Sequence, residues 1–287
     1  MPLPATPAAL VVDGHNLLFA CYYGMPDRIR SVSGVPIHGT YGFIAALLKM
    51  IRRLEPDVIV VCFDAEEQSF RTGIDSSYKS DRQQSAEDLK PFFLQLVDVK
   101  RGLEHLDVRW LEIAGVEADD VIGTLARRLA KSHRVYIAST DHDMYQLIDE
   151  RTYVFASTRG MHTEYGPEDI VAKYGVRPAQ FVDYKALVGD TSDTIRGVSG
   201  IGPKTASMLL NAFEDVPGIL ANLGALKPRI AAALVESQDR TELNRQLITI
   251  KTDVENPLLE GDFSFSPQTD TGALSVRTIM RELGLMP

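Results

Sequence analysis

The chain has 287 residues, of which 45% are apolar and 24% charged, so it can form one large α/β domain or a large and a small one. No apolar run reaches the roughly 20 residues that cross a bilayer, the N-terminus does not resemble a signal peptide, and Cys21 and Cys62 match no zinc-binding spacing. We therefore expect a cytoplasmic protein with reduced cysteines and no membrane partner. The net charge of −9 does not exclude a nucleic-acid partner, because the distribution of charge matters more than its sum.

Up to about residue 165, short apolar runs alternate with longer segments of helical spacing. In chain order, the sequence predicts a strand at Ala8–Val12, a helix at Tyr41–Leu54, a strand at Val58–Phe63, a helix at Ala86–Leu106, a strand at Arg109–Ile113, a helix at Asp119–Leu129, a strand at Val135–Ala138, a short helix near Met144–Ile148 and a strand at Tyr153–Phe155. This alternation predicts crossover connections and a mainly parallel sheet flanked by helices.

After about Tyr165 the pattern becomes helical, with one weak strand signal at Phe263–Phe265. Helices are predicted at Pro167–Tyr174, Pro178–Val188, Pro203–Phe213, Lys227–Val235, Arg240–Ile250 and Ser275–Leu283. We expect two halves without a flexible linker: an α/β half of residues 1–165 and a helical half of residues 166–287.

The polar and basic stretch Ser69–Ser85 fits neither half. It directly follows the strand that ends at Asp64, and long irregular segments inside compact domains are often functional loops. Its basic residues next to an acidic region predict a clamp on a phosphate group.

Acidic side chains recur where apolar runs end. They are Asp13, Asp64, Glu117, Asp119, Asp120, Asp141, Asp143, Asp190 and Asp193. The carboxyl ends of parallel strands meet in one crevice, where nine carboxylates would repel one another unless cations neutralised them. Hard divalent ions, Mg²⁺ or Mn²⁺, prefer such oxygen ligands, and without these nine acids the chain would be neutral. The pattern predicts a metal-dependent phosphoryl-transfer site.

The separate clusters suit two cations about 4 Å apart, which generate hydroxide from water and stabilise the attacking and leaving oxygens. One ion is expected at Asp13, Asp64, Glu117 and Asp119, and the other at Asp141, Asp143, Asp190 and Asp193, whereas Asp120 is the weakest candidate. The alternative for each cluster is an ordinary helix N-cap, since carboxylates are favourable there. All of the caps would then have to coincide with strand ends by chance.

A glycine-rich turn, Gly197–Ala206, precedes one of the predicted helices. Glycines let the backbone approach a phosphate, Pro203 suits a first helical position, and Lys204 lies in the first turn. The backbone N–H groups and Lys204 can hold a DNA phosphate without reading sequence. It is not a Walker loop, because the Gly-Lys-Ser/Thr order and a preceding strand are both missing. The alternative is a plain corner between two helices.

Taken together, these segments resemble the bacterial 5′–3′ exonucleases and flap endonucleases, including the N-terminal nuclease domain of DNA polymerase I. The matching segments are Val11–Gly14, Tyr41–Phe43, Phe63–Ala65, Ser69–Arg71, Tyr78–Arg82, Gly115–Asp120, Ser139–Leu147, Val188–Asp193 and Gly197–Ala206. They keep the family's order from residue 8 to about 250. The resemblance implies a PIN-like nuclease core, a helical arch at about residues 69–92, and a helix-three-turn-helix motif that holds duplex DNA.

The resemblance also implies roles for single residues. All nine carboxylates fall on the family's metal ligands, with Asp13, Asp64 and Glu117 taking part in catalysis. Lys79 and Arg82 match arch residues that position the scissile phosphate and offset its charge, and Arg71 matches a basic residue at the arch base. The residues implied to contact DNA are Arg71, Tyr78, Lys79, Arg82, Gly200, Gly202, Lys204 and Thr205. The carbonyls of Val198 and Ile201 would hold a potassium ion against a DNA phosphate.

The chain departs from the family pattern in three places. Thr194 and Arg196 stand where the family commonly has Asn and Pro. Phe19-Ala20-Cys21 replaces a Tyr-Arg-Ala stretch, which puts one substrate contact in doubt. The arch segment has Thr72 and Gly73 in place of a His-Glu pair.

These features predict a structure-specific 5′ nuclease, active as a monomer on DNA with 5′ flaps, frayed ends or nicks and on RNA-primed strands, in replication and repair. Two alternatives stay open. A PIN-type ribonuclease would share the carboxylates but would not need the glycine-rich turn. A non-catalytic protein that binds branched DNA could lose metal ligands, and none is evidently lost here.

Overall fold

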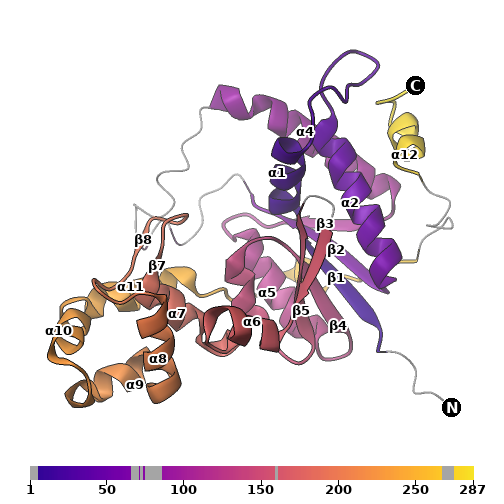
Figure 1. Ribbon diagram of the computed structural model, residues 1–287. Helices are drawn as coiled ribbons and strands as arrows, with labels where there is room; N and C mark the ends of the chain where they lie inside the picture. The colour runs from indigo at the N-terminus through magenta and orange to yellow at the C-terminus, as the bar shows by residue number, and fades with distance from the viewer. Residues whose placement is uncertain (1–5, 66–70, 72–73, 75–85, 159–160, 267–274) are drawn as a thin grey trace.

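A six-stranded sheet forms the centre of the computed structural model, which describes residues 6–65, 71, 74, 86–158, 161–266 and 275–287 (Figure 1). The strand order is β3-β2-β1-β4-β5-β6, and only β6 runs antiparallel to its neighbour. The strands are β1 (Ala8–Asp13), β2 (Val58–Phe63), β3 (Arg109–Glu112), β4 (Arg134–Ala138), β5 (Thr152–Thr158) and β6 (Met161–Tyr165). The expected parallel sheet is confirmed, and β6 adds an antiparallel edge that the sequence pattern did not predict.

The two central strands are buried on both faces. Alternate residues of β1 belong to different cores: Ala9 and Val11 pack on one face of the sheet, and Leu10 and Val12 on the other. β2 is buried along its whole length. Such continuous apolar runs form strands because each face of a parallel sheet is covered by helices.

Different helices cover each face. On one face lie α1 (Gly14–Gly24), α2 (His38–Leu54) and α4 (Ala86–His105), and on the other lies α5 (Ala118–Leu129) together with parts of the helical half. We did not predict α1, because its residues Phe19 to Tyr23 are apolar around the whole helix and leave no amphipathic period. The helix begins at Asp13, which caps it by accepting a hydrogen bond from the Asn16 N–H (3.0 Å).

The remaining elements include short 3₁₀ helices and a small hairpin. They are η2 (His142–Leu147), α6 (Pro167–Tyr174), η3 (Pro178–Gln180), α7 (Phe181–Val188), β7 (Gly189–Asp190), β8 (Ile195–Arg196), α8 (Pro203–Phe213), α9 (Val216–Ala221), η4 (Leu223–Ala225), α10 (Pro228–Glu236), α11 (Gln238–Ile248), η5 (Pro257–Glu260) and α12 (Val276–Glu282). The helix predicted at Pro178–Val188 is therefore divided in two, and the one near Met144 is a 3₁₀ helix. The β7–β8 hairpin and α9 were not predicted, because two-residue strands and one short helix leave no periodic signal.

The end of the chain returns to the sheet. Ser264 forms an antiparallel bridge with Val58, and Ile279 of α12 is buried in the core shared by α2 and α4. The weak strand signal at Phe263–Phe265 thus corresponds to a single bridge. The expected division into residues 1–165 and 166–287 stays a prediction. Of the helices described, none has the length and apolar character needed to span a membrane.

Gly14 lets α1 begin directly against β2. A Cβ at this position would come within 2.2 Å of the Phe63 ring, next to Asp64. We expect Gly14→Ala to lower the free energy of unfolding by about 1–3 kcal/mol, since the ring must move to make room. Urea unfolding measures this change. Gly24→Ala is the control: no atom lies within 4 Å of its added Cβ, so a similar loss in both variants would contradict the contact.

Candidate active site

The first group of carboxylates lies at the carboxyl ends of β1 and β2. Asp13 is buried, caps α1, and accepts a second hydrogen bond from Ser139 Oγ (2.9 Å) just after β4. Asp64 follows β2 and accepts a hydrogen bond from the Ala118 N–H (2.8 Å), at the start of α5. The Asp64 N–H in turn donates to His15 Nδ1 (3.0 Å). Parallel pairing of β1 with β2 and β4 therefore places both carboxylates beside the same end of the sheet, as the sequence predicted.

The N-terminus of α5 brings Glu117 and Asp119 to this end. Glu117 is the N-cap residue of α5, and Asp119 lies in its first turn. Because Ala118 binds Asp64, the first turn of α5 is tied to the end of β2. Asp13, Asp64 and Asp119 all act on the Cys62 thiol, whose pKa is raised by burial and further by these three charges. The ends of β1 and β2 and the first turn of α5, which carry the four expected ligands of the first ion, therefore lie next to one another.

The second group is built on η2 and the β7–β8 hairpin. Asp141 caps η2 by accepting a hydrogen bond from the Asp143 N–H (2.8 Å), and its own N–H donates to Ser139 Oγ (3.0 Å). Asp190 accepts hydrogen bonds from the N–H (2.8 Å) and Oγ (2.6 Å) of Ser192. Asp193, the fourth member, is buried in the same loop. Ser139 therefore connects the two groups, since it binds both Asp13 and Asp141.

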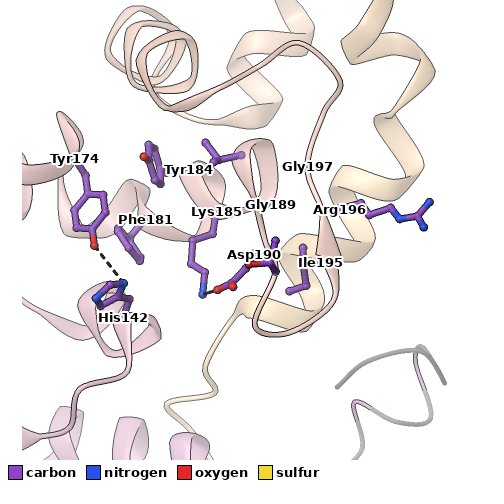
Figure 2. A pocket seen from close by; sticks show the side chains of 12 residues that line it. His142, Tyr174, Phe181, Tyr184, Lys185, Gly189, Asp190, Ile195, Arg196 and Gly197 are labelled. Carbon is purple, nitrogen blue, oxygen red and sulfur yellow. Dashed lines mark hydrogen bonds and ion pairs between the residues drawn. The ribbon is translucent and has the colours of Figure 1, made fainter. Parts of the chain in front are cut away.

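Lys185 of α7 joins two members of this group, and the sequence analysis did not include it among the site residues. Its buried Nζ forms ion pairs with Asp143 and with Asp190, and Figure 2 shows it beside Asp190. Burial lowers the pKa of Lys185, but the two carboxylates raise it more, so the ammonium stays charged. One signal was available: Lys185 is a lysine in a mostly apolar helical run, five residues before Asp190.

The proton affinities of the carboxylates reflect their crowding. Burial raises the pKa of Asp13 to about 7, and the charges of Asp64 and Asp141 add to this shift. Burial also raises the pKa of Asp143 to about 6, although Lys185 acts against it. For Asp190, the hydrogen bonds from Lys185 and Ser192 outweigh burial and lower the pKa to about 2.

This donor set fits hard divalent cations. Its side chains offer carboxylate oxygens at one end of the sheet, which Mg²⁺ and Mn²⁺ prefer. Within the described residues, no group of three or more acidic, histidine or cysteine side chains lies close enough together to hold a metal ion. Mg²⁺ commonly keeps several waters and binds through only one or two carboxylates.

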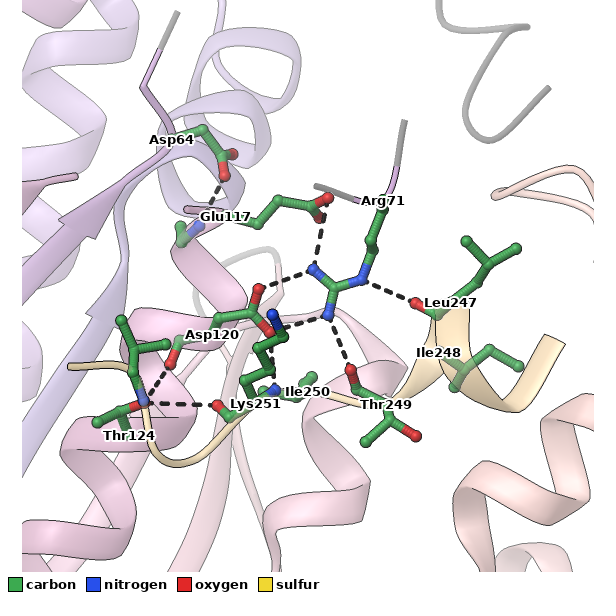
Figure 3. A network of polar contacts seen from close by, with 12 residues as sticks. Asp64, Arg71, Glu117, Asp120, Thr124, Leu247, Ile248, Thr249, Ile250 and Lys251 are labelled. Atoms are coloured by element: carbon green, nitrogen blue, oxygen red, sulfur yellow. Dashed lines mark hydrogen bonds and ion pairs between the residues drawn. The ribbon is translucent and has the colours of Figure 1, made fainter. Parts of the chain in front are cut away.

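Two expectations about site residues are wrong, as Figure 3 shows. Asp120 is fully buried and binds the Arg71 guanidinium through two hydrogen bonds of 2.8 Å, so it is not placed as a metal ligand. Arg71 is 2% exposed and also donates to two backbone carbonyls, so it cannot contact a DNA phosphate. It also lies 3.5 Å from Glu117 Oε1, and thus neutralises the acidic N-terminus of α5 from inside. The three other arch residues, Tyr78, Lys79 and Arg82, lie outside the described residues.

The glycine-rich turn forms the entry to α8. Gly200 has φ of +78°, a conformation that favours glycine, and Gly202 is the N-cap residue. Lys204 is exposed in the first turn, while the Val198 and Ile201 side chains are buried beneath it. The Thr205 N–H donates to the Gly202 carbonyl (3.0 Å). The turn thus presents backbone and one cation to the solvent, as a phosphate-binding site requires.

A cavity of about 630 Å³ lies between this turn and η2 (Figure 2). Aromatic rings of Tyr174, Phe181 and Tyr184 form one wall, and Lys185 and Asp190 form another. The Tyr174 hydroxyl lies 3.3 Å from His142 Nδ1 across its edge. The cavity therefore adjoins the second carboxylate group.

Comparison with known proteins assigns the chain to a family. The family model described as the 5′–3′ exonuclease N-terminal resolvase-like domain matches residues 8–175, and the one described as the 5′–3′ exonuclease C-terminal SAM fold matches residues 176–271. The chain belongs to the 5′–3′ exonuclease family. Family membership agrees with the mainly parallel sheet and the helical second half.

The relatives in sequence are DNA polymerases. The thermostable DNA polymerase I of Thermus thermophilus is 36% identical over 96% of this chain and 33% of its own length. DNA polymerase I of Deinococcus radiodurans is 38% identical over 88% of this chain and 26% of its own length. The chain thus spans about a third of the curated relatives that it matches.

Solved structures of this family share the fold. A T5 5′-exonuclease with bound zinc ions matches with a TM-score of 0.71 and 25% identity, over 84% of this chain and 89% of the other. A T5 flap endonuclease variant in complex with DNA and metal ions also gives 0.71, at 24% identity over 84% of this chain and 88% of the other. At 24% identity, the match to the T5 flap endonuclease variant indicates a shared fold only.

The raised pKa of Asp13 predicts a pH-dependent stability of the metal-free protein. Between pH 3.8 and about 7 the folded carboxyl binds a proton that the unfolded one releases, so its contribution to stability falls as pH rises. The lowered pKa of Asp190 does not oppose this trend, because it changes stability only between about pH 2 and pH 3.8. His15, His142 and His162 have lowered pKa values and act in the opposite direction, so a difference between variants is needed.

In EDTA, the free energy of unfolding of the wild type relative to Asp13→Asn should fall by roughly 1 kcal/mol or more from pH 4 to pH 7. Urea unfolding at one-unit pH steps measures it. Asp27→Asn, an exposed carboxyl, should leave the wild-type profile unchanged. A constant difference between wild type and Asp13→Asn would contradict the raised pKa.

Thr194 is strained beside Asp193. Its φ is +62°, which is unfavourable for a β-branched residue, and its buried Oγ1 has no hydrogen-bond partner among the described residues. Asn tolerates this conformation, so Thr194→Asn should raise the free energy of unfolding by about 1 kcal/mol. Thermal unfolding in EDTA tests it. Thr191→Asn in the same loop serves as the control, and equal effects of the two changes would exclude strain as the cause.

Proposed function

We propose that this chain is a divalent-metal-dependent 5′ nuclease that hydrolyses DNA phosphodiesters near 5′ ends and flap junctions. The proposal is supported by eight acidic side chains from five segments, four at the carboxyl end of the central sheet and one in the β7–β8 hairpin, together with a glycine-rich turn suited to phosphate. Family membership supports the same chemistry, and the T5 relatives were crystallised with divalent metals. Cleavage would leave a 3′-hydroxyl and a 5′-phosphate.

Two ions, Mg²⁺ or Mn²⁺, would be held by the two carboxylate groups. The proposed ligands are Asp13, Asp64, Glu117 and Asp119 for one ion, and Asp141, Asp143, Asp190 and Asp193 for the other. When bound, such ions activate water and offset charge on the phosphate oxygens. The protein's own part is to orient these oxygens: Ser139 and Asn16 fix Asp13, Ala118 fixes Asp64, and Ser192 fixes Asp190.

Lys185 would keep Asp143 and Asp190 close together before metal enters. An ammonium between two carboxylates offsets their repulsion and holds both elements in place. Its stem lies at the wall of the aromatic cavity, so it also closes the second group towards the protein interior.

The turn at Gly200, Gly202, Lys204 and Thr205 would hold the duplex through its phosphates, with or without a potassium ion at the Val198 and Ile201 carbonyls. Such contacts carry no sequence information, so binding should weaken steeply with salt. By resemblance, Tyr78, Lys79 and Arg82 would act from the arch on the scissile phosphate.

The proposed substrates are DNA with 5′ flaps, frayed ends or nicks and RNA-primed strands. We also propose a cytoplasmic monomer that acts in replication and repair. The proposed domains are a nuclease core of residues 1–165 and a helical region of residues 166–287.

Asp141→Asn tests the assignment. We expect it to reduce cleavage of a labelled 5′-flap substrate in Mg²⁺ by at least about 100-fold, because it removes a ligand charge. Junction binding in EDTA should stay within about threefold, since the glycine-rich turn is unchanged. Asp239→Asn, an exposed residue in the first turn of α11, is the control and should cleave like the wild type.

The same assay with single-stranded RNA and Y-junctions, in Mg²⁺, Mn²⁺ or EDTA, separates the alternatives. Cleavage of RNA but not of flaps would favour a PIN-type ribonuclease. Tight junction binding without cleavage in either metal would favour a non-catalytic DNA-binding protein.

A further inference from the structure

The segment Leu247–Lys251, called the strap below, leads from the end of α11 back to the nuclease core. Five of its backbone groups form hydrogen bonds with side chains of the nuclease core, and Figure 3 shows those from Arg71 and Asp120. The contacts are Arg71 Nε to the Leu247 carbonyl (2.9 Å), Gln146 Nε2 to the Ile248 carbonyl (3.0 Å), Arg71 Nη2 to the Thr249 carbonyl (2.8 Å), the Ile250 N–H to Gln146 Oε1 (2.9 Å) and the Lys251 N–H to Asp120 Oδ1 (2.8 Å).

Gln146 makes a further contact that connects the strap to a proposed metal ligand. It lies on η2, three residues after Asp143, and its Nε2 also donates to the Asp143 carbonyl (3.0 Å). The orientation of the amide is fixed by its partners, because Ile250 offers only an N–H while Asp143 and Ile248 offer only carbonyls. One side chain thus joins the peptide of Asp143 to the strap.

The other end of the strap is tied to the second part of the site. On α11, Asn244 Nδ2 donates to the carbonyls of Ala186 (3.2 Å) and Arg196 (2.8 Å), and Arg245 Nε donates to Asp183 (2.6 Å). These partners lie on α7 and β8, which carry Lys185 and face Asp190. The strap with α11 therefore spans from Asp143 on η2 to the hairpin that presents Asp190.

Two connections thus set the spacing between Asp143 and Asp190. One is the Lys185 ammonium, which divalent cations compete against because they bind the same two carboxylates. The other, through Gln146 and Asn244, consists of neutral amides and backbone, and it does not compete with cations. A hydrogen-bond partner that orients a metal-binding residue typically raises metal affinity 10–100-fold.

We propose that Gln146 is a positioning residue of the nuclease reaction: through the strap it holds Asp143 in register with Asp190 while metal is bound. The proposal rests on the proposed two-metal nuclease function. It assigns Gln146 no contact with substrate or metal. It also explains why the strap takes its hydrogen bonds from site loops rather than from a neighbouring strand.

The test is direct Mn²⁺ binding, followed by the electron paramagnetic resonance signal of the free ion, on the full chain without DNA. Gln146→Met keeps the volume and removes all three hydrogen bonds. We expect it to weaken Mn²⁺ binding at one class of site about 10-fold and to raise the Mg²⁺ concentration for half-maximal flap cleavage by a similar factor. Junction binding in EDTA should not change.

Gln95→Met is the matched control. Gln95 is also buried and holds the start of α2 through Gly39 (2.7 Å) and Thr40 (3.1 Å), away from the carboxylates. Both variants should lower the urea midpoint, but only Gln146→Met should lower Mn²⁺ affinity. Equal Mn²⁺ affinities in the two variants would reduce Gln146 to a structural residue and overturn the proposal.

Gly123→Ala provides a second route if Gln146→Met does not fold. Its added Cβ would meet Ile250 Cγ2 at 2.6 Å and the Lys251 carbonyl at 2.8 Å, so it displaces the strap from α5 without changing Gln146. It should also weaken Mn²⁺ binding, and wild-type affinity would contradict the strap's role. If the wild type binds no Mn²⁺, the proposed function itself is refuted. If the wild type binds Mn²⁺ but does not cleave flaps, flap cleavage is refuted, and the Mn²⁺ affinities of the Gln146 and Gln95 variants still decide the role of Gln146.

Discussion

The burial of carboxylates at the ends of the central strands, close to further acidic groups, is the constraint on which the rest of this structure depends. Parallel strands β1 and β2 end beside each other, so Asp13 and Asp64 cannot be separated without breaking the sheet. The pKa of Asp13 near 7 shows that hydrogen bonds from Asn16 and Ser139 do not fully compensate for burial and charge. Divalent cations bound between these carboxylates would offset the unfavourable free energy of burying them.

Two buried cationic side chains, Arg71 and Lys185, offset part of this negative charge. They lie in different surroundings. Arg71 is enclosed by Asp120 and two carbonyls, which satisfy a planar guanidinium from several sides. These contacts hold the Arg71 guanidinium in place and support the N-terminal turn of α5 from the protein interior. Lys185 instead faces the cavity between two proposed ligands, where a compact ammonium can give way to a metal ion.

The helical half also supports the site, in addition to carrying the proposed surface for DNA. The glycine-rich turn begins only a few residues after Asp193, so the loop that would hold the duplex is continuous with the loop that would hold metal. Asn244 and the strap then connect α11 to both sides of the site. The strain at Thr194 lies within the same short loop, where Asn would adopt the backbone at less cost.

The sequence alone determined the five parallel strands, most of the longer helices, the carboxylates near strand ends and the turn before α8, because each depends on local periodicity or on residues close in the chain. It did not determine which charges are paired. Arg71 binds a carboxylate 49 residues away and a carbonyl 176 residues away, and Lys185 pairs with Asp143 across 42 residues. In the sequence, a basic residue beside an acidic motif is equally consistent with a DNA contact and with an internal ion pair. Only the folded structure shows which group lies beside it. For the same reason Asp120 was grouped with the metal ligands, whereas the tertiary structure turns it inward to Arg71.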